Sequence, residues 1–334
     1  MPKYFVTGAT GFIGGHVARQ LRQAGHDVVA IARDPARATE LAAAGVQVVL
    51  GDVTDKESLR PAMQAVDGVF HLAGWYQVGV RDKSPGVRIN IEGTRNVLEV
   101  MRDSGVPRGV YTSTLAVNGD THGQVVDETY RFNGPFASEY DRTKWAAHYE
   151  VAEPMIREGL PLIIVQPGGV YGPGDNSPQG QMLRQYLQRK LPAVPRGAAL
   201  CWAHVEDTAR GHLLAMERGN VGESYIIAGP TATVIDALRL AERLTGIPAP
   251  RLQPPPVLIK GIAALMSVVE KVVPVPDTMS AEYLRVSAGA TYLGSNAKAR
   301  RELGYNPRPL EDGLRETLEY ELARLRRAPL AAVS

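Results

Sequence analysis

A glycine-rich turn at the start of the chain constrains the fold most strongly. It contains Gly8, Gly11 and Gly14, follows a strand-like run over 3–6 and precedes an amphipathic run over 12–24. Glycines at this spacing allow a tight turn and a close approach of backbone to ligand. The helix that follows would offer free N–H groups to a pyrophosphate. A plain strand-turn-helix with incidental glycines is the alternative, and the position of the turn in a βαβ unit favours dinucleotide binding.

The composition is that of an ordinary globular protein and excludes several classes of site. The chain has 334 residues, of which 44% are hydrophobic and 22% are charged. This length predicts about two domains. The net charge of +2 gives no indication of a nucleic-acid partner. Cys201 is the single cysteine, and the histidines lack metal-ligand spacing, so we predict no disulfide and no metal site.

The sequence predicts no transmembrane segment. Its most apolar stretch, 256–273, is interrupted by Lys260, Glu270 and Lys271, whereas a spanning helix needs about 20 consecutive apolar residues. These charges show no clear polar face that would favour binding to a membrane surface. No signal-peptide pattern precedes the first strand-like run, so a cytoplasmic location is expected.

Strand-like and helix-like segments alternate through the first half of the chain, which predicts a parallel sheet covered by helices on both faces. The expected strands are 3–6, 27–32, 46–50, 68–72, 110–113 and 161–166, and the expected helices are 12–24, 35–44, 56–64, 87–104 and 140–158. Ligands of such sheets bind at the carboxyl ends of the strands.

The pattern changes after the sixth expected strand. Segment 173–195 is rich in Pro, Gly and Gln and is expected to be irregular, 223–228 reads as a returning strand, and the chain is mostly helical from 230 onward, with 248–256 as a stiff connector. We therefore predict an α/β fold with a Rossmann-type, doubly wound parallel sheet over 1–170, to which 203–229 return. A smaller, mostly helical substrate-binding domain is predicted over 171–334.

Tyr140 and Lys144 are the strongest candidates for catalysis. They are four residues apart on an expected helix, so they share one face. An ammonium near a phenol lowers the pKa of the phenol, which suits proton transfer near neutral pH. Such pairs are also common on solvent-facing helices. The glycine-rich turn and the hydroxyls of residues 112–114, at the end of the fifth strand, make the catalytic interpretation specific.

These motifs together resemble the extended short-chain dehydrogenases/reductases. This superfamily includes the nucleotide-sugar epimerases and dehydratases and the dihydroflavonol-reductase-like enzymes, and the chain resembles the latter branch. The resemblance covers nearly the whole chain. The matching segments are Thr7–Gly14, Asp52-Val53, His71–Gly74, Asn90–Thr94, the Tyr140/Lys144 pair, Pro167, Val170–Gly174, His204–Ala209 and Lys298–Gly313.

The resemblance implies a division of labour among the site residues. Tyr140 would exchange a proton with the substrate oxygen, Lys144 would hold the ribose hydroxyls, and Thr114, or else Ser113, would hydrogen-bond the reacting oxygen. The implied cofactor contacts are Gly8, Thr10, Gly11, Phe12, Ile13, Gly14, Arg33, Arg37, Asp52, Val53, Leu72, Ala73, Gly74, Thr112, Ser113, Tyr140, Lys144, Pro167, Gly168 and Val170. Relatives commonly dimerise through the helices that match 87–104 and 140–158, so a homodimer is expected.

The residues after the second strand favour NADP over NAD as the cofactor. Relatives that prefer NAD carry an acidic residue where this chain has Ala32. Arg33 follows directly and Arg37 lies one helical turn further on, and both suit a 2′-phosphate. Both arginines could instead face solvent, and Asp34 leaves NAD open.

The substrate side is expected to be apolar. Relatives that bind nucleotide sugars carry an Asn at Gly169 and an Arg-Asp pair where Leu200 and Cys201 stand here. Aromatic and apolar residues gather instead around the expected site, although such residues also serve as ordinary core. The set comprises Trp75, Tyr76, Phe132, Phe136, Trp202 and the segment 257–273.

The sequence thus predicts an NADPH-linked carbonyl reductase or alcohol dehydrogenase that acts on a hydrophobic small molecule. A nucleotide-sugar epimerase with tightly bound NAD and a non-catalytic NADP-binding regulator are the alternatives. Dehydratase relatives carry an acidic pair beside the catalytic hydroxyl. Leu115 follows Thr114 here, which disfavours dehydration. His204 lies in a family motif and is expected to be structural.

Overall fold

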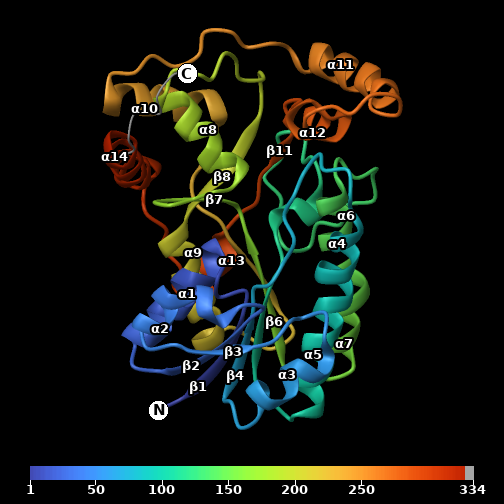
Figure 1. Cartoon of the computed structure of the whole chain (residues 1–334), viewed down its shortest axis with the longest axis vertical. Helices are drawn as coiled ribbons and strands as arrows, with labels where there is room; N and C mark the ends of the chain where they lie inside the picture. Colours follow the sequence, from blue (N-terminus) through green and yellow to red (C-terminus); the bar gives the residue numbers. More distant parts are fainter. Residues whose placement is uncertain (328–334) are drawn as a thin grey trace.

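A large parallel sheet organises the computed structural model, which describes residues 1–327. The sheet lies in the lower half of Figure 1, and a smaller part of the chain lies beyond its upper end. The end of the predicted substrate domain, 328–334, lies outside the described residues. No helix within 1–327 is both long enough and apolar enough to cross a membrane.

The large sheet has seven strands in the order β3-β2-β1-β4-β5-β6-β9, and every neighbouring pair is parallel. The strands are β1 (Lys3–Thr7), β2 (Asp27–Ala32), β3 (Gln47–Leu50), β4 (Gly68–His71), β5 (Gly109–Thr112), β6 (Leu162–Pro167) and β9 (Ser224–Ile227). The order reverses between β1 and β4, which creates a crevice at the carboxyl ends of these strands. The predicted Rossmann-type, doubly wound fold is therefore confirmed.

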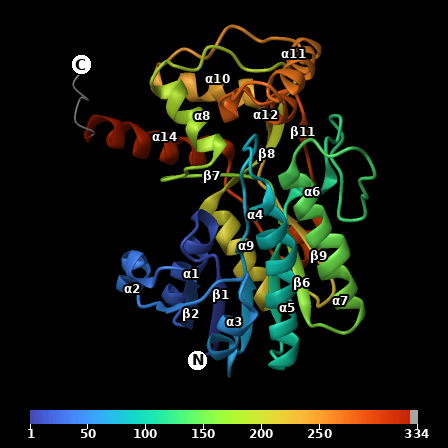
Figure 2. The same cartoon turned by 45° about the vertical axis from the view of Figure 1, so that its right-hand side comes forward.

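Helices cover both faces of this sheet, each through its own apolar core. One face carries α1 (Phe12–Gln23), α2 (Thr39–Ala43), α9 (Val205–Arg218) and α13 (Ala297–Leu303). The other carries α3 (Lys56–Met63), α5 (Gly93–Asp103) and α7 (Glu153–Arg157). Helix α6 (Glu139–Ala146) leads into α7 through residues 147–152, which also join this core. Figure 2 shows these two layers on either side of the strands.

Three of the predicted helices are subdivided in the structure. Segment 35–44 forms η1 (Pro35–Arg37), which Asp34 caps through the Ala36 N–H, and then α2. Segment 87–104 continues from α4 (Ser84–Gly86) through a π-helical segment, η2 (Val87–Glu92), into α5. Segment 140–158 likewise has a π-helical middle, η4 (Ala147–Ala152), between α6 and α7. Such π-helical insertions leave no signature in hydrophobic periodicity, so the sequence predicts them as continuous helix.

The smaller part contains a second sheet that the sequence analysis did not predict. Strand β8 (Ala199–His204) pairs with β7 (Gly169–Tyr171), β10 (Thr231–Thr233) and β11 (Thr291–Tyr292). The prediction of an irregular 173–195 is wrong, because it contains α8 (Pro178–Leu187), whose N-cap Ser177 accepts from the Gly180 N–H. Pro178 occupies the first helical position, where a missing N–H costs nothing.

Four further helices complete the smaller part, together with a short turn. They are α10 (Val234–Thr245), α11 (Pro256–Val269), η5 (Asp277–Met279), α12 (Ala281–Ser287) and α14 (Leu310–Arg327). A third core cluster joins β8, α8, α10 and α14 around Trp202. In Figures 1 and 2, α14 lies above the sheet on the same side as α1 and α2.

Candidate active site

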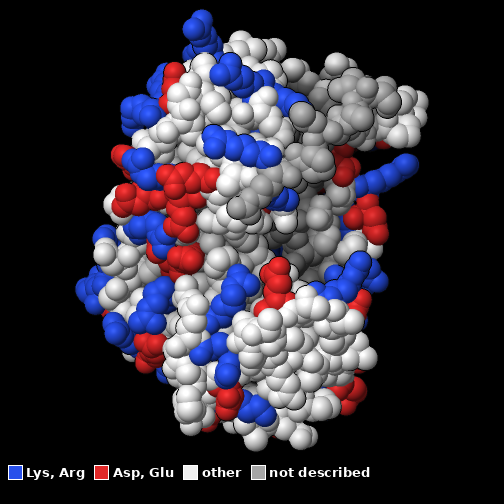
Figure 3. All heavy atoms as spheres, turned by 60° about the vertical axis from the view of Figure 1, so that its left-hand side comes forward, with Lys and Arg blue, Asp and Glu red and all other residues white. Residues whose placement is uncertain are grey.

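A cavity of about 1170 Å³ lies at the carboxyl ends of the large-sheet strands. Its lower wall comprises the glycine-rich turn, the end of β5 and the side chains of Tyr140 and Lys144. Residues 173–177, Gln179 of α8 and Tyr320 of α14 form the opposite wall. The cavity therefore lies between the two parts of the chain, and Figure 3 shows the molecule hollowed on this side, with acidic and basic side chains interspersed around it.

The glycine-rich turn fits a dinucleotide pyrophosphate. Gly8 has a φ of 72°, and a Cβ there would lie 2.6 Å from the Ala73 nitrogen. A Cβ on Gly14 would lie 2.1 Å from the Gly8 oxygen. Gly11, the N-cap of α1, supplies no capping side chain, and no acidic residue lies in the first turn. The N–H groups and positive dipole end of α1 are thus available to an anion.

Tyr140 and Lys144 reach the cavity from the first turns of α6. Ser138 begins this helix by accepting from the Asp141 N–H at 3.1 Å. The Lys144 ammonium donates to the Thr112 carbonyl at 2.8 Å and to the Tyr111 hydroxyl at 3.1 Å. Burial lowers the pKa of Lys144 to about 7. Because Lys144 faces neutral oxygens, it can bind further hydroxyl groups as a donor.

The structure differs from the sequence analysis on the acidity of Tyr140. We expected Lys144 to lower the pKa of this phenol, but burial raises it well above its ordinary value. Desolvation disfavours the charged phenolate, and here it outweighs a side-chain hydrogen bond with Thr114, which acts in the opposite direction. In this arrangement Tyr140 is a protonated group, suited to donating a proton.

Thr114 and Ser113 occupy different environments, although they are adjacent in sequence. The Ser113 side chain lies 2.7 Å from Nδ1 of His148, a buried residue of η4. Thr114 caps η3 (Leu115–Asn118) by accepting from the Ala116 N–H at 3.1 Å, and its hydroxyl acts to lower the pKa of the Tyr140 phenol. Ser113 borders the cavity, but the hydroxyl that affects the pKa of Tyr140, the candidate proton donor, belongs to Thr114.

Asp141 is a buried carboxyl group next to Tyr140 that the sequence analysis did not consider. It is 4% exposed, its backbone N–H donates to the Ser138 hydroxyl that caps α6, and the backbone N–H of Ser138 acts to lower the pKa of its carboxyl group. The Tyr292 hydroxyl of β11 lies 3.5 Å from its Oδ2. Burial, followed by the nearby Glu282 carboxylate, raises the pKa of Asp141 to about 7.

Asp141→Asn is expected to flatten the pH dependence of stability. Because the folded state holds this proton up to about pH 7 and the unfolded state releases it near 3.8, the wild-type free energy of unfolding should fall as pH rises between these values. The shift corresponds to at most about 4 kcal/mol. Urea unfolding from pH 4 to 7.5 measures the slope for both proteins. An unchanged slope in Asp141→Asn would contradict the assignment, whatever the loss of capping does to absolute stability.

Most of the predicted cofactor residues border the cavity, and four of them do not. Bordering it are Gly8, Thr10, Gly11, Phe12, Ile13, Gly14, Arg37, Leu72, Gly74, Thr112, Ser113, Tyr140, Lys144, Pro167, Gly168 and Val170. Arg33 is exposed and does not border it. Asp52 accepts from Thr54 through Oδ1, and Val53 is buried against Gly93. Ala73 donates its N–H to the Thr7 hydroxyl from beneath the turn.

Several residues that border the cavity were missed from sequence. Arg19 follows the glycine turn on α1, where helical periodicity could have indicated it. Asp175, Ser177 and Gln179 come from the segment predicted as irregular, and Tyr320 comes from a helix far along the chain. No local pattern places these last four residues near the turn, because tertiary packing alone brings the two walls together.

The predicted aromatic lining is mostly absent from the cavity. Of that set, Tyr76 borders it, with its ring centroid 4.6 Å from that of Tyr140. Trp202 is 1% exposed within the core of the smaller part, where it donates to the Ala232 carbonyl. Phe132 and Phe136 form a cluster with Trp145 in which the rings are tilted against one another. Most of α11 is exposed to solvent.

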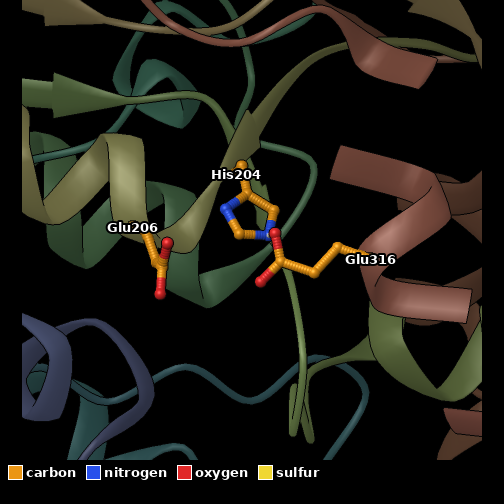
Figure 4. Close-up of side chains that lie close together, drawn as sticks. All are labelled: His204, Glu206 and Glu316. Carbon is orange, nitrogen blue, oxygen red and sulfur yellow. The ribbon is translucent and has the colours of Figure 1, made fainter. Parts of the chain in front are cut away.

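A group of potential metal ligands lies outside the cavity. His204, Glu206 and Glu316 approach one another in Figure 4, which shows the imidazole directed toward the Glu316 carboxylate. Arg308 already donates to Glu316 at 2.7 Å and to Glu206 at 3.2 Å. A cation here would compete with this guanidinium, and burial lowers the pKa of His204 to about 4. We interpret the cluster as an ion-pair network that joins α14 to α9.

Comparison with known proteins identifies the family. Residues 4–228 match the model of the NAD-dependent epimerase/dehydratase family. The chain belongs to this family. It is accordingly an extended short-chain dehydrogenase/reductase, an NAD(P)-dependent oxidoreductase class.

Individual relatives extend the match to 90% or more of the chain. Sterol demethylase protein B of Methylococcus capsulatus is 31% identical over 90% of this chain and 93% of its own length. A 4-hydroxy-2-methyl-3-oxo-4-farnesyl-3,4-dihydroquinoline-1-oxide ketoreductase of Stigmatella aurantiaca is 31% identical over 90% and 91%. The crystal structure of gox2253 superposes with a TM-score of 0.86 at 31% identity, covering 98% of this chain and 99% of that one.

Proposed function

We propose that the protein is an NADPH-linked reductase that interconverts a carbonyl and an alcohol on a largely apolar small molecule, with Tyr140 as the proton donor. The observation that carries the proposal is convergence on one cavity. The glycine-rich turn, Tyr140 and Lys144 all border it, and the Thr114 hydroxyl acts on Tyr140 by lowering the pKa of its phenol. A nucleotide and a reacting carbonyl both fit within such a volume.

In this proposal Tyr140, Thr114 and Lys144 each have a separate role in the reaction. The bound nicotinamide supplies or accepts the hydride. Tyr140 donates its proton to the carbonyl oxygen during reduction, and the Thr114 hydroxyl orients that oxygen and the phenol. Lys144, fixed between Thr112 and Tyr111, presents its remaining donor to ribose hydroxyls. Its positive charge also favours the phenolate that forms after proton transfer.

Two observations support an apolar carbonyl substrate with a polar substituent. Gly169 leaves the cavity wall without the Asn that sugar-nucleotide enzymes carry, and Cys201 is buried where they carry a charged pair. The names of two relatives contain a sterol and a farnesyl group. The wall near Asp175, Ser177 and Gln179 would then meet a hydroxyl or amide of the substrate.

A screen of carbonyl compounds tests the proposal directly. Aromatic ketones, alkyl ketones and sterol-like ketones would be offered with NADPH, and its oxidation followed at 340 nm. Turnover of at least one class, with loss of the ketone and formation of the alcohol, is expected. NADPH binding without turnover across the panel would favour a non-catalytic role instead.

Arg37→Ala is expected to weaken NADPH binding about tenfold and to leave NADH binding within about twofold. Arg37 borders the cavity with a largely exposed guanidinium, and its one ion-pair partner among residues 1–327 is Asp34 at 3.8 Å, so it can bind a 2′-phosphate. Fluorescence titration with both nucleotides measures the effect.

Arg33→Ala is the matched control for this measurement, because Arg33 is a neighbouring arginine that does not border the cavity. It should alter neither affinity by more than about twofold. Tighter binding of NADH than NADPH by the wild type would refute the cofactor preference. Equal losses for both nucleotides in Arg37→Ala would refute the 2′-phosphate contact.

The polar wall at Asp175–Gln179 also supports the alternative that the protein is a nucleotide-sugar epimerase, since sugars require many hydrogen bonds. An epimerase returns the hydride to the same substrate and retains its cofactor. Protein purified with stoichiometric, tightly held NAD, together with interconversion of sugar epimers without net NADPH use, would establish this alternative.

The remaining expectations concern the substrate-binding domain and the oligomeric state. We propose that 171–334, apart from the returning segment 203–229, bind the substrate. We also propose that α5 and the α6–α7 helix pair two copies into a homodimer. Sedimentation equilibrium measures the oligomeric state, and a monomer at micromolar concentration would contradict the latter proposal.

A further inference from the structure

A buried histidine that the proposed reaction does not use lies directly behind the cavity. His212 of α9 is fully buried, and both of its ring nitrogens have partners. Its Nε2 lies 2.9 Å from the hydroxyl of Thr112, at the end of β5. Its Nδ1 lies 2.8 Å from the carbonyl oxygen of Thr208, one turn earlier in α9. Because Thr112 borders the cavity, this histidine links the core of the large sheet to the candidate site.

The Thr208 carbonyl decides which nitrogen of His212 carries hydrogen. A carbonyl oxygen only accepts, so Nδ1 donates to it. Burial lowers the pKa of His212 to about 4, so the ring is neutral near pH 7 and has a single N–H. Nε2 is therefore an acceptor. The Thr112 hydroxyl, the partner of Nε2, donates its hydrogen to it.

This pairing leaves the Thr112 hydroxyl with acceptor capacity alone. A free hydroxyl can donate or accept by rotating its hydrogen, but His212 uses this hydrogen, and the two lone pairs of the oxygen remain. Branching at Cβ restricts the threonine side chain to few rotamers, which helps to hold the arrangement. A ligand in the cavity therefore meets Thr112 as an oxygen that accepts and does not donate.

The main chain of Thr112 holds a group of the opposite kind. The Lys144 ammonium donates to the Thr112 carbonyl at 2.8 Å and to the Tyr111 hydroxyl at 3.1 Å. It keeps one hydrogen for a ligand and has no acceptor capacity. A single residue thus anchors a donor through its carbonyl and supplies an acceptor through its side chain. A ligand hydroxyl matches such a pair, because it accepts through its oxygen and donates its own hydrogen.

We propose that His212 is a positioning residue that fixes the Thr112 hydroxyl as the acceptor for a ribose hydroxyl of the nicotinamide nucleotide. That ribose hydroxyl would accept from Lys144 and donate to Oγ1 of Thr112. The inference rests on the proposed binding of the nicotinamide half of the cofactor beside Lys144. It explains why a fully buried, neutral histidine lies behind the end of β5.

A double-mutant cycle in NADPH affinity tests the proposal on the full-length protein. Thr112→Val removes the acceptor but keeps the shape of the side chain, and it should weaken NADPH binding about fivefold to tenfold. His212→Phe keeps a ring without an acceptor, which frees the Thr112 hydrogen to turn elsewhere, so a similar loss is expected. If His212 acts through Thr112, T112V/H212F should bind NADPH within about twofold of Thr112→Val.

Conservative variants separate this role from simple packing. His212→Gln retains an acceptor and Thr112→Ser retains a hydroxyl, so both should bind NADPH within about threefold of wild type. Thr317→Val is the matched control. Thr317 is buried in α14, its hydroxyl donates to the Gly313 carbonyl at 2.7 Å, and it does not border the cavity, so its loss should leave NADPH affinity unchanged. Urea unfolding reports whether each variant is folded.

Two results would overturn the proposal. The first is wild-type NADPH affinity in Thr112→Val. The second is additive losses in T112V/H212F, because His212 would then act on the fold and not through Thr112.

A cofactor analogue identifies the group that Thr112 binds. The acetylpyridine analogue of NADPH lacks the carboxamide N–H groups and keeps the ribose hydroxyls. The loss caused by Thr112→Val should persist with this analogue, and its disappearance would overturn the assignment to ribose. A wild type that binds neither NADPH nor NADH would refute the proposed function, and this inference with it.

Discussion

Tyr140→Phe is expected to lower kcat by about 10²–10⁴-fold, the usual contribution of a positioned general acid. The change deletes one hydroxyl and keeps the ring, so the ring contact with Tyr76 at 4.6 Å is preserved. Lys144 is held by Thr112 and Tyr111, and the substitution does not touch either bond. NADPH affinity should therefore stay within about threefold of wild type, because most cofactor contacts are unchanged.

Steady-state kinetics with a ketone from the screen and a separate NADPH titration measure these two quantities. Tyr305→Phe is the matched control, since it also removes a buried hydroxyl and burial also raises the pKa of Tyr305, but its ring lies outside the cavity. It should leave kcat unaltered. If Tyr140→Phe retains kcat within tenfold while binding NADPH normally, another group donates the proton.

Gly14→Ala is expected to abolish measurable NADPH binding and to lower the free energy of unfolding by about 3 kcal/mol. The new methyl group would lie 2.1 Å from the Gly8 oxygen and 2.7 Å from the Gly8 carbonyl carbon. Both are backbone atoms of the turn, so no side chain can move aside. Relief of the clash requires α1 to shift away from the turn, which displaces the N–H groups offered to the pyrophosphate.

Gly15→Ala provides the control one residue further along the same helix. Its methyl group would meet the Ala9 oxygen at 3.3 Å and the flexible end of the Arg19 side chain at 3.4 Å. Alanine also favours the helix over glycine by about 0.5–1 kcal/mol, so stability should change by no more than about 1 kcal/mol in either direction. Urea unfolding and fluorescence titration compare the two variants. Wild-type affinity in Gly14→Ala would show that the turn does not hold the cofactor.

The large sheet could be predicted from sequence because each of its strands is specified by a pattern of neighbouring residues. Strand β2 was expected over the residues at which the structure places it, 27–32, and the other strands of the large sheet shift by one residue at one or both ends. Runs of buried apolar residues, separated by turn residues and amphipathic helices, permit few other arrangements. The glycines of the first turn are likewise required locally, since Gly8 adopts a positive φ.

The smaller part was predicted less well because its elements depend on distant partners. Strand β8 pairs with three short strands spread from Gly169 to Tyr292, and none of them is stable alone. The polar wall from Asp175 to Gln179 follows from α8, whose Pro-rich start suggested a loop. The expected aromatic lining failed for the same reason: Trp202 alternates along β8 toward the core rather than toward the cavity.

The sequence by itself determined the Rossmann-type sheet, the glycine turn and the Tyr140/Lys144 pair, because each depends on spacing within one strand, turn or helix. Only the tertiary structure decided the environment of these groups. It pairs the Ser113 hydroxyl with His148, it makes Thr114 the hydroxyl that affects the Tyr140 pKa, and it reverses the expected shift in that pKa. Desolvation depends on everything packed around a group, and hydroxyl partners depend on helices that meet in space. Residue spacing alone therefore predicts neither the desolvation of a group nor its hydroxyl partners.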